Sequence, residues 1–400
     1  MIQSKIKYFY FFRGNLSSHV HFFKALQKTC DNNKLNLILI TFLNPKVYVN
    51  QFSLVKGFRS ETFRVIISPL NSVTPLLYFF FAIFFSKKTI IHLKKINPKV
   101  FSILKTIFKR KLILVADLEG DLISENHYLL QHKFNNKSIV NEEKELFVKE
   151  EFAKLSIYDT VFVRNEYYEK LLKKRHPTLK SAIITSDLMS FKKGTLFFDA
   201  TLRNEIRLKL GWNDSHIITY IGNIFYPWQH LSKTIRVYKK IKKELSKKAK
   251  LLLLIRKADH QLAEEFIAKH ELDQDDYYLQ EVPHNEMKGY LSASDLGIVI
   301  RDFHEMNRVV IPGKLLDYLA CGLPVITSSV FGNISEYIKN NNYGLVLETL
   351  NLESIQFNII QSLLSLKDYK KNEISNWAND NLSVDETSLP YIETMKSFNV

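Results

Sequence analysis

The segment IPGKLLDYLACGLPVITS, residues 311–328, gives the strongest indication of a fold class. Its Pro-Gly pair suits the start of a helix, because proline loses nothing in the first helical turn, where its N–H would have no partner. Apolar residues then recur at helical spacing and predict one buried face. Gly322 suits a left-handed helix end, and Pro324 prevents the helix from continuing. Residues 325–327 read as a buried strand, so the stretch indicates helix, turn and strand, as in a doubly wound sheet.

Two charged residues occupy the first turns of this predicted helix. Lys314 opposes the positive end of the helix dipole, a penalty of roughly 0.3 to 1 kcal/mol that a bound anion would reverse. Asp317 follows on the same face, where a carboxylate can accept both hydroxyl protons of a ribose diol. Arg301 and Arg308 precede the helix, so we expect three cations to converge at its start. The alternative is an ordinary surface Lys-Asp ion pair.

Strand and helix patterns alternate along the chain in two successive sets, which predicts parallel sheets wrapped by helices. A chain of 400 residues also favours two domains over one core. Predicted strands occupy residues 6–12, 35–42, 89–93, 112–116, 160–164 and 183–184 in the first set, and 217–221, 250–255, 278–281, 296–300 and 325–327 in the second.

The composition is basic, with 56 Lys and Arg against 41 Asp and Glu and a formal net charge of +15. This balance suits anionic lipid or phosphate-bearing substrates. No nucleic-acid-binding module accompanies the charge, so nucleic acid is not expected as a partner. Cys30 and Cys321 are the two cysteines, which indicates a reducing compartment without a disulfide framework.

The apolar run PLLYFFFAIFF, residues 75–85, allows two interpretations. It has about half of the roughly 20 residues that a spanning helix needs. It is either a packing helix of the first domain or a surface helix that dips into a membrane, an interpretation that the basic stretch 94–111 favours. The N-terminus lacks the pattern of a secretory signal. We therefore expect a cytoplasmic protein, peripheral on the inner face of the membrane if this run contacts lipid.

Residues 292–332, SASDLGIVIRDFHEMNRVVIPGKLLDYLACGLPVITSSVFG, resemble the donor-binding region of retaining GT-B glycosyltransferases of the group 1 (family 4) type, closest to bacterial surface-polysaccharide enzymes. This resemblance implies an α/β GT-B fold, in which the parallel sheets of two Rossmann-like domains face a central cleft. It places an acceptor-binding domain at residues 1–190, a nucleotide-sugar-binding domain at 191–375, and a C-terminal helix at 376–400 that crosses back to the first domain.

The same resemblance assigns donor-binding roles. The acid at Asp317 would contact the nucleotide ribose, and neighbouring residues would contact the diphosphate. The segment 198–223 resembles the start of a donor domain, with a Gly-Asn loop whose backbone can approach a phosphate. Arg256 and Lys257 follow a predicted strand and are either phosphate ligands or solvated strand-end charges. The expected donor-binding residues are Gly222, Asn223, Arg256, Lys257, Arg301, Asn307, Arg308, Lys314 and Asp317.

Two loops of the first half resemble the acceptor side of such enzymes. The loop ADLEGD, residues 116–121, supplies Asp117 and Glu119 as candidate catalytic carboxylates, although Asp117 also suits a structural cap. The loop after the first predicted strand supplies the acceptor-side candidates Arg13, Gly14, Asn15 and His19, next to serines that suit a helix N-cap.

No metal or cofactor is expected. Residues 273–276 contain an Asp-x-Asp, but a hydrated turn explains it, and the histidines and cysteines lack zinc spacing. The resemblance instead implies a nucleotide-diphosphate sugar as substrate and a lipid-linked or other glycan as acceptor. Val309 stands where more distant relatives carry a second Glu. The alternatives are a sugar-nucleotide epimerase of the same fold and a non-catalytic scaffold that binds a partner enzyme or a membrane.

Overall fold

The structure is a computed structural model of the chain. It describes residues 7–13, 23, 26–27, 30–31, 37–43, 63–69, 83–84, 86, 88–94, 98–133, 137–187, 190–245, 248–352 and 355–398.

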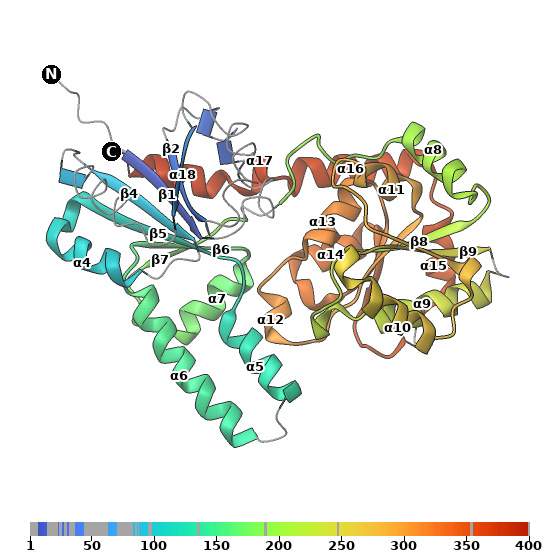
Figure 1. The fold of residues 1–400 in the computed structure, drawn as a ribbon, viewed down its shortest axis with the longest axis horizontal. Coiled ribbons are helices and arrows are strands. Elements are labelled where there is room, and N and C mark those ends of the chain that lie inside the picture. Colours follow the sequence, from blue (N-terminus) through green and yellow to red (C-terminus); the bar gives the residue numbers. More distant parts are fainter. Residues whose placement is uncertain are drawn as a thin grey trace. The chain divides into compact units, whose positions relative to one another are not determined.

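The chain forms two compact units, each built on its own sheet (Figure 1). The first unit comprises residues 1–190 together with 384–400, and the second comprises residues 191–383. The return to the first unit therefore comes later than the expected residue 376. The reason is that one helix, α16 (Asp368–Asn381), continues to pack in the second unit through Ile374 and Ala378.

The first unit contains a sheet of seven parallel strands in the order β3-β2-β1-β4-β5-β6-β7. Strand β4 is buried along its whole length and lies at the centre of the order. The strands are β1 (Lys7–Arg13), β2 (Leu37–Leu43), β3 (Phe63–Pro69), β4 (Thr89–Lys94), β5 (Leu112–Leu118), β6 (Thr160–Val163) and β7 (Ala182–Thr185).

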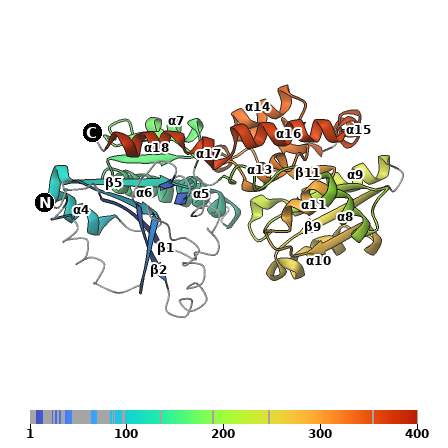
Figure 2. The ribbon, with the colours of Figure 1, turned by 90° about the horizontal axis from the view of Figure 1, so that it is seen from above.

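Helices of the first unit come from both ends of the chain. The C-terminal helix α18 packs Tyr391, Ile392 and Met395 into the same core as Tyr8 and Phe162, and Figure 2 shows it lying over the sheet. The described helices are α4 (Lys99–Phe108), α5 (Leu122–Lys133), α6 (Lys137–Leu155), α7 (Glu166–Arg175), α17 (Val384–Thr387) and α18 (Leu389–Ser397).

The second unit contains a six-stranded parallel sheet in the order β10-β9-β8-β11-β12-β13. The reversal between β8 and β11 brings the first strand of this unit beside its fourth, so the carboxyl ends of both strands meet at one edge. The strands are β8 (His216–Ile221), β9 (Ala249–Leu254), β10 (Tyr277–Gln280), β11 (Leu296–Val299), β12 (Val325–Ser328) and β13 (Gly344–Leu347).

Helices cover both faces of this second sheet. Side chains of α11, α13, α14 and α16 share one hydrophobic core, and side chains of α9, α10 and α15 share another. The helices are α8 (Ala200–Leu210), α9 (Leu231–Glu244), α10 (His260–Lys269), α11 (Met287–Ala293), α12 (Glu305–Arg308), α13 (Gly313–Ala320), α14 (Asn333–Asn340), α15 (Phe357–Leu364) and α16.

The stretch 311–328 folds as helix α13, a turn and strand β12. Gly322 has a φ of +71°, and a Cβ atom built there would lie 2.3 Å from the backbone oxygen of Lys371. Glycine is therefore required for the turn both by its backbone angle and by the space that α16 leaves.

Some elements differ from the sequence-based expectations. Strands β3 and β13 were not among the predicted strands. Both lie at the edges of their sheets, and neither FRVIISP nor GLVL alternates regularly between apolar and polar residues. Of the apolar run 75–85, residues 83 and 84 are described, and there Ile83 is buried while Phe84 is exposed. In the described part of the chain, no helix combines the length and apolar character that crossing a bilayer requires.

Candidate functional site

Three parts of the second unit meet at the carboxyl edge of its sheet. Strand β8 ends at Ile221 and continues into Gly222, and strand β11 leads to Arg301. Ser328, at the end of β12, fixes the backbone at Arg301, because its Oγ accepts from the Arg301 N–H at 2.9 Å and donates to the Arg301 carbonyl at 2.8 Å. Helix α13 begins at this edge, between strands β11 and β12 in the chain.

Two cations converge on one neutral oxygen at this edge. Lys314 Nζ donates to Gln229 Oε1 at 3.0 Å, and Arg301 Nη2 donates to the same oxygen at 3.2 Å. The Arg301 residue is 9% exposed, so its guanidinium is held inside the site. The pair confirms part of the expected convergence, and the acceptor between them, Gln229, was not predicted.

Tyr220 contacts both Lys314 and the loop that follows β8. Lys314 Nζ lies 4.0 Å from the centre of the Tyr220 ring, a favourable cation–π geometry. The Tyr220 hydroxyl lies 3.1 Å from the Asn223 carbonyl and 3.3 Å from the Gln229 carbonyl, so it joins both ends of the loop after β8. Gly222 has a φ of +101°, and a Cβ there would lie 3.5 Å from Lys314 Nζ. The positive φ therefore favours glycine here, whereas a Cβ would only make an ordinary contact with Lys314.

Burial changes the ionisation of both charged residues of α13. Burial, followed by the positive charge of Arg301, lowers the pKa of Lys314 well below its ordinary value. Burial raises the pKa of Asp317 to about 7. In the described structure Lys314 Nζ donates to Gln229 and forms no ion pair with Asp317, so the surface ion-pair interpretation is wrong. The charges of Lys314 and Asp317 therefore do not compensate each other.

The other expected donor residues have different surroundings. Arg256 pairs with Asp259 at 2.9 Å and its side chain is 55% exposed. The Lys257 side chain is exposed, and its backbone N–H donates to Glu281. Arg308 is exposed on α12, whereas Asn307 is buried and donates to the carbonyl of Asp302 at 2.9 Å. The structure therefore brings Arg301 and Lys314 together and leaves Arg256, Lys257 and Arg308 exposed.

Asn223 has a buried side-chain oxygen that finds no hydrogen-bond partner within the described residues. A buried acceptor without a donor is costly, so it is a natural contact for a ligand hydroxyl. In the same unit, Asp302 is bound by His230 Nε2 and by Lys233 Nζ, each at 2.8 Å. Sequence reasoning missed Gln229, His230 and Lys233, because a loop reading NIFYPWQH carries no phosphate-binding pattern.

The first unit has a polar network at the carboxyl end of β4 and β5. Asp117 Oδ1 accepts from His92 Nε2 at 2.9 Å and from the Tyr10 hydroxyl at 3.2 Å, while Oδ2 accepts from Lys94 Nζ at 2.6 Å. His92 Nδ1 lies 3.0 Å from the Tyr391 hydroxyl of α18. Since Nε2 donates to a carboxylate, Nδ1 accepts this second bond.

The side chains of this network shift one another's pKa values. Burial alone would raise the pKa of Asp117, but Lys94 and His92 outweigh it and hold the pKa well below its usual range. Burial alone would lower the pKa of Lys94, but Asp117 and Glu119 outweigh it and raise the pKa. Burial lowers the pKa of His92 despite Asp117, so the imidazole stays neutral at neutral pH.

Lys94 does not support the interpretation that the basic stretch 94–111 faces a membrane. Its side chain is 1% exposed and lies against two carboxylates. Glu119 is the second of these, 3.0 Å from Lys94 Nζ and 30% exposed. Asp117 is therefore engaged on both oxygens, and Glu119 is the more accessible of the two predicted carboxylates.

The acceptor-side candidates lie largely outside the described residues. Arg13 ends strand β1, and nothing is described of its side chain. Gly14, Asn15 and His19 fall in the segment that the structure does not describe. Their assignment stays a prediction.

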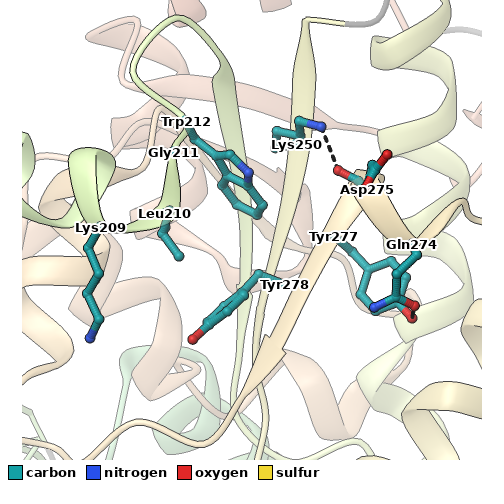
Figure 3. Close-up of a pocket in the computed structure, with 9 residues that line it drawn as sticks. All are labelled: Lys209, Leu210, Gly211, Trp212, Lys250, Gln274, Asp275, Tyr277 and Tyr278. Atoms are coloured by element: carbon teal, nitrogen blue, oxygen red, sulfur yellow. Dashed lines mark hydrogen bonds between the residues drawn. The ribbon is translucent and has the colours of Figure 1, made fainter.

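A pocket of about 460 Å³ lies at the opposite edge of the second sheet, where strands β8, β9 and β10 begin (Figure 3). Several of its polar groups are already bonded internally: Lys250 Nζ donates to the Asp275 carbonyl, and the Tyr277 hydroxyl donates to Gln274. None of the expected donor residues lines it. Its lining residues are Lys209, Leu210, Gly211, Trp212, Lys250, Gln274, Asp275, Tyr277 and Tyr278.

The second unit matches a known family model. Residues 203–377 match the model described as "Glycosyl transferases group 1", a range that contains Arg301, Lys314 and Asp317. No protein of curated function matches the sequence of the chain.

Solved structures resemble the whole chain. The HepE protein of Anabaena, in complex with UDP and glucose, is 12% identical, covers 98% of this chain and 100% of its own, and has a TM-score of 0.63. Sucrose-phosphate synthase of Thermosynechococcus elongatus is 14% identical, with 98% and 99% coverage and a TM-score of 0.66. A glycosyltransferase of Rickettsia africae is 15% identical, with 98% coverage of both chains and a TM-score of 0.61. These neighbours confirm the GT-B fold class.

Proposed function

We propose that the protein is a retaining glycosyltransferase that moves a sugar from a nucleotide-diphosphate sugar to a glycan acceptor, lipid-linked, in surface-polysaccharide synthesis. One observation carries the proposal: Arg301 and Lys314 point at a single oxygen position at the start of α13, inside the range that matches the glycosyltransferase model. Such a pair suits the diphosphate of a nucleotide sugar.

The site's main chemical task would be to stabilise the leaving group. As the bond from the anomeric carbon to the β-phosphate oxygen breaks, negative charge grows on that oxygen. Cations held in place before the reaction stabilise this charge without rearranging. Lys314 and Arg301 are fixed by Gln229, Tyr220 and Ser328, which supports this role.

Asp317 would bind the ribose of the donor. It lies three residues after Lys314 on α13, and the described structure holds no hydrogen bond or ion pair to its carboxylate. A carboxylate can accept two hydroxyl protons from a diol. Because burial raises the pKa of Asp317 to about 7, we expect donor binding to strengthen as pH rises through neutrality.

Retention would follow from attack on the face that the phosphate leaves. The acceptor oxygen forms the new bond to the anomeric carbon, and its proton departs with the phosphate. We propose that the first unit binds the acceptor and that Glu119, rather than Asp117, is the carboxylate that meets it, since Glu119 is the more exposed. No metal ion is needed in this proposal, because two protein cations already face the diphosphate position.

The acceptor, pathway and location rest on the resemblance of residues 292–332 and on the basic composition of the chain. We propose a cytoplasmic enzyme, peripheral at the inner face of the membrane, where anionic lipid attracts a chain with a net charge of +15.

A donor screen tests the function. UDP-glucose is the first candidate, because the Anabaena neighbour was solved with it, and sugars of other nucleoside diphosphates follow. We expect one donor to raise the melting temperature and to be hydrolysed slowly without acceptor. If no donor binds, the proposal is wrong. If a donor is converted to a free or isomerised sugar that no acceptor can intercept, the epimerase alternative replaces it.

A further inference from the structure

We propose that Gln229 is a positioning residue for the donor: its side-chain oxygen holds Arg301 and Lys314 in the arrangement that a diphosphate oxygen takes over on binding. This inference rests on the proposed function, and it adds a residue that neither the sequence pattern nor the family resemblance assigns.

The contacts of the Gln229 side chain are those of a phosphate oxygen. Its Oε1 lies 3.0 Å from an ammonium nitrogen and 3.2 Å from a guanidinium nitrogen. An amide oxygen has two lone pairs and can accept both bonds at once. Phosphate oxygens accept from Lys and Arg at similar distances, and do so more strongly because they carry charge. A diphosphate can therefore displace the amide without moving either cation far.

The backbone holds Gln229 independently of the two cations. Its N–H donates to the Tyr226 carbonyl at 3.0 Å, and its carbonyl lies 3.3 Å from the Tyr220 hydroxyl. The next residue, His230, has a left-handed φ of +50° and directs its own ring to Asp302. The loop thus holds the backbone of Gln229 without help from the two cations, and the side-chain oxygen extends from this backbone to both of them.

Neutrality of the amide matters as much as its position. A carboxylate here would pair with both cations and compete with the donor diphosphate. The neighbouring carboxylate, Asp302, has one oxygen bound by His230 and the other by Lys233. Gln229 therefore presents Lys314 and Arg301 with a neutral acceptor, while each oxygen of Asp302 is bound by His230 or Lys233.

Three variants of the full chain test the inference: Gln229→Glu, Gln229→Ala and, as a charge-matched control, Gln361→Glu on the exposed face of α15. Binding of inorganic pyrophosphate and of UDP is measured by titration calorimetry. Tryptophan fluorescence reports folding, because all three tryptophans lie in the second unit.

We expect Gln229→Glu to weaken pyrophosphate binding by about tenfold or more, Gln229→Ala by about two- to fivefold, and the control not at all. The two cations would lower the pKa of a glutamate here below its ordinary value of about 4.3, so the deficit of Gln229→Glu relative to wild type is expected to persist down to about pH 4. A structural role alone predicts the reverse order, since Glu keeps the shape of Gln and Ala does not.

The outcomes separate the two proposals. Wild-type affinity in Gln229→Glu, or a larger loss in Gln229→Ala than in Gln229→Glu, overturns the role of Gln229 and leaves the proposed function standing. If wild type binds neither pyrophosphate nor any nucleotide sugar of the donor screen, the donor site itself is wrong and the inference falls with it.

Discussion

Each unit of the protein holds a lysine near the carboxyl edge of its sheet, and the two lysines are treated in opposite ways. Lys94 of the first unit lies between Asp117 and Glu119, and these carboxylates raise its pKa. Lys314 of the second unit lies beside a neutral amide and a second cation, and its pKa is lowered. The first charge is compensated within the fold, and the second is not.

The partners of a buried lysine distinguish a structural cation from a cation that binds a ligand. A buried lysine whose partners are carboxylates contributes to the folded state, because removing it leaves uncompensated charges behind. A lysine whose partners are neutral gains little from folding, and its charge is available to an anionic ligand. The same substitution should therefore have opposite effects in the two units.

The largest expected effect is on the stability of the first unit. Lys94→Met leaves Asp117 buried without its cation, which should cost about 3–5 kcal/mol of unfolding free energy. Urea unfolding followed by far-UV circular dichroism should show an early transition. Tryptophan fluorescence, which reports the second unit, should not change. The exposed Lys111→Met serves as control, and equal stability of the two variants would contradict this reading of the network.

Lys314→Met should have the opposite profile. We expect donor binding to weaken by about 100-fold, because the variant loses a charge-assisted bond to the diphosphate. The unfolding free energy should stay the same or rise, since a partly buried, poorly compensated charge is removed. Calorimetry with the donor and fluorescence-detected unfolding measure the two quantities. Lys257→Met, exposed at the same edge, should change neither by a comparable amount.

Asp317→Asn should change how the unfolding free energy depends on pH. Burial raises the pKa of Asp317 to about 7, above its unfolded value near 4, so the folded state binds more protons between these values. The contribution of Asp317 to stability is therefore present below about pH 4 and is lost as pH rises through about 7. The variant should exceed wild type by about 1–2 kcal/mol at pH 8, with the gap closing toward pH 4.

The same variant should weaken donor binding by about tenfold at pH 8, through the loss of the ribose contact. Unfolding curves at several pH values measure the first effect, and calorimetry measures the second. Asp214→Asn, at an exposed position of the same unit, is the control. A flat difference in stability across pH would show that Asp317 ionises normally.

The smallest expected effect concerns the C-terminal helix. Tyr391→Phe removes the hydroxyl that bonds His92 Nδ1 and should cost about 1 kcal/mol in the first unit. Circular dichroism should detect the shift, and tryptophan fluorescence should not. Tyr369→Phe, at a tyrosine that is 73% exposed in the second unit, should leave both signals unchanged.

Much of the fold was predictable from local pattern. The helix, turn and strand of residues 311–328 appear as α13 and β12, because proline, glycine and apolar spacing act within a few residues. The edge strands β3 and β13 were missed, since neither shows a distinct alternation of apolar and polar residues. Lys314, Arg301 and Arg308 were expected to converge because both arginines directly precede the helix that Lys314 begins, and Arg308 is exposed instead.

The polar partners were not predictable. Gln229 and Lys314 are 85 positions apart, and His92 and Tyr391 are 299 apart. Nothing in the local sequence of either pair signals the contact. Lys94 likewise looked like one member of a basic stretch, although Asp117, 23 positions later, is its partner.

Local sequence is enough to predict the alternating α/β elements, the glycine turn at Gly322 and the positions of the candidate charges, because backbone angles and apolar periodicity are local properties. Which of these charges are compensated depends on the folded arrangement. A lysine's state depends on the groups within a few ångströms of its nitrogen, and folding brings those groups from distant parts of the chain. For this reason Lys94 is a structural cation and Lys314 is a candidate donor-binding cation, although the two residues are chemically identical.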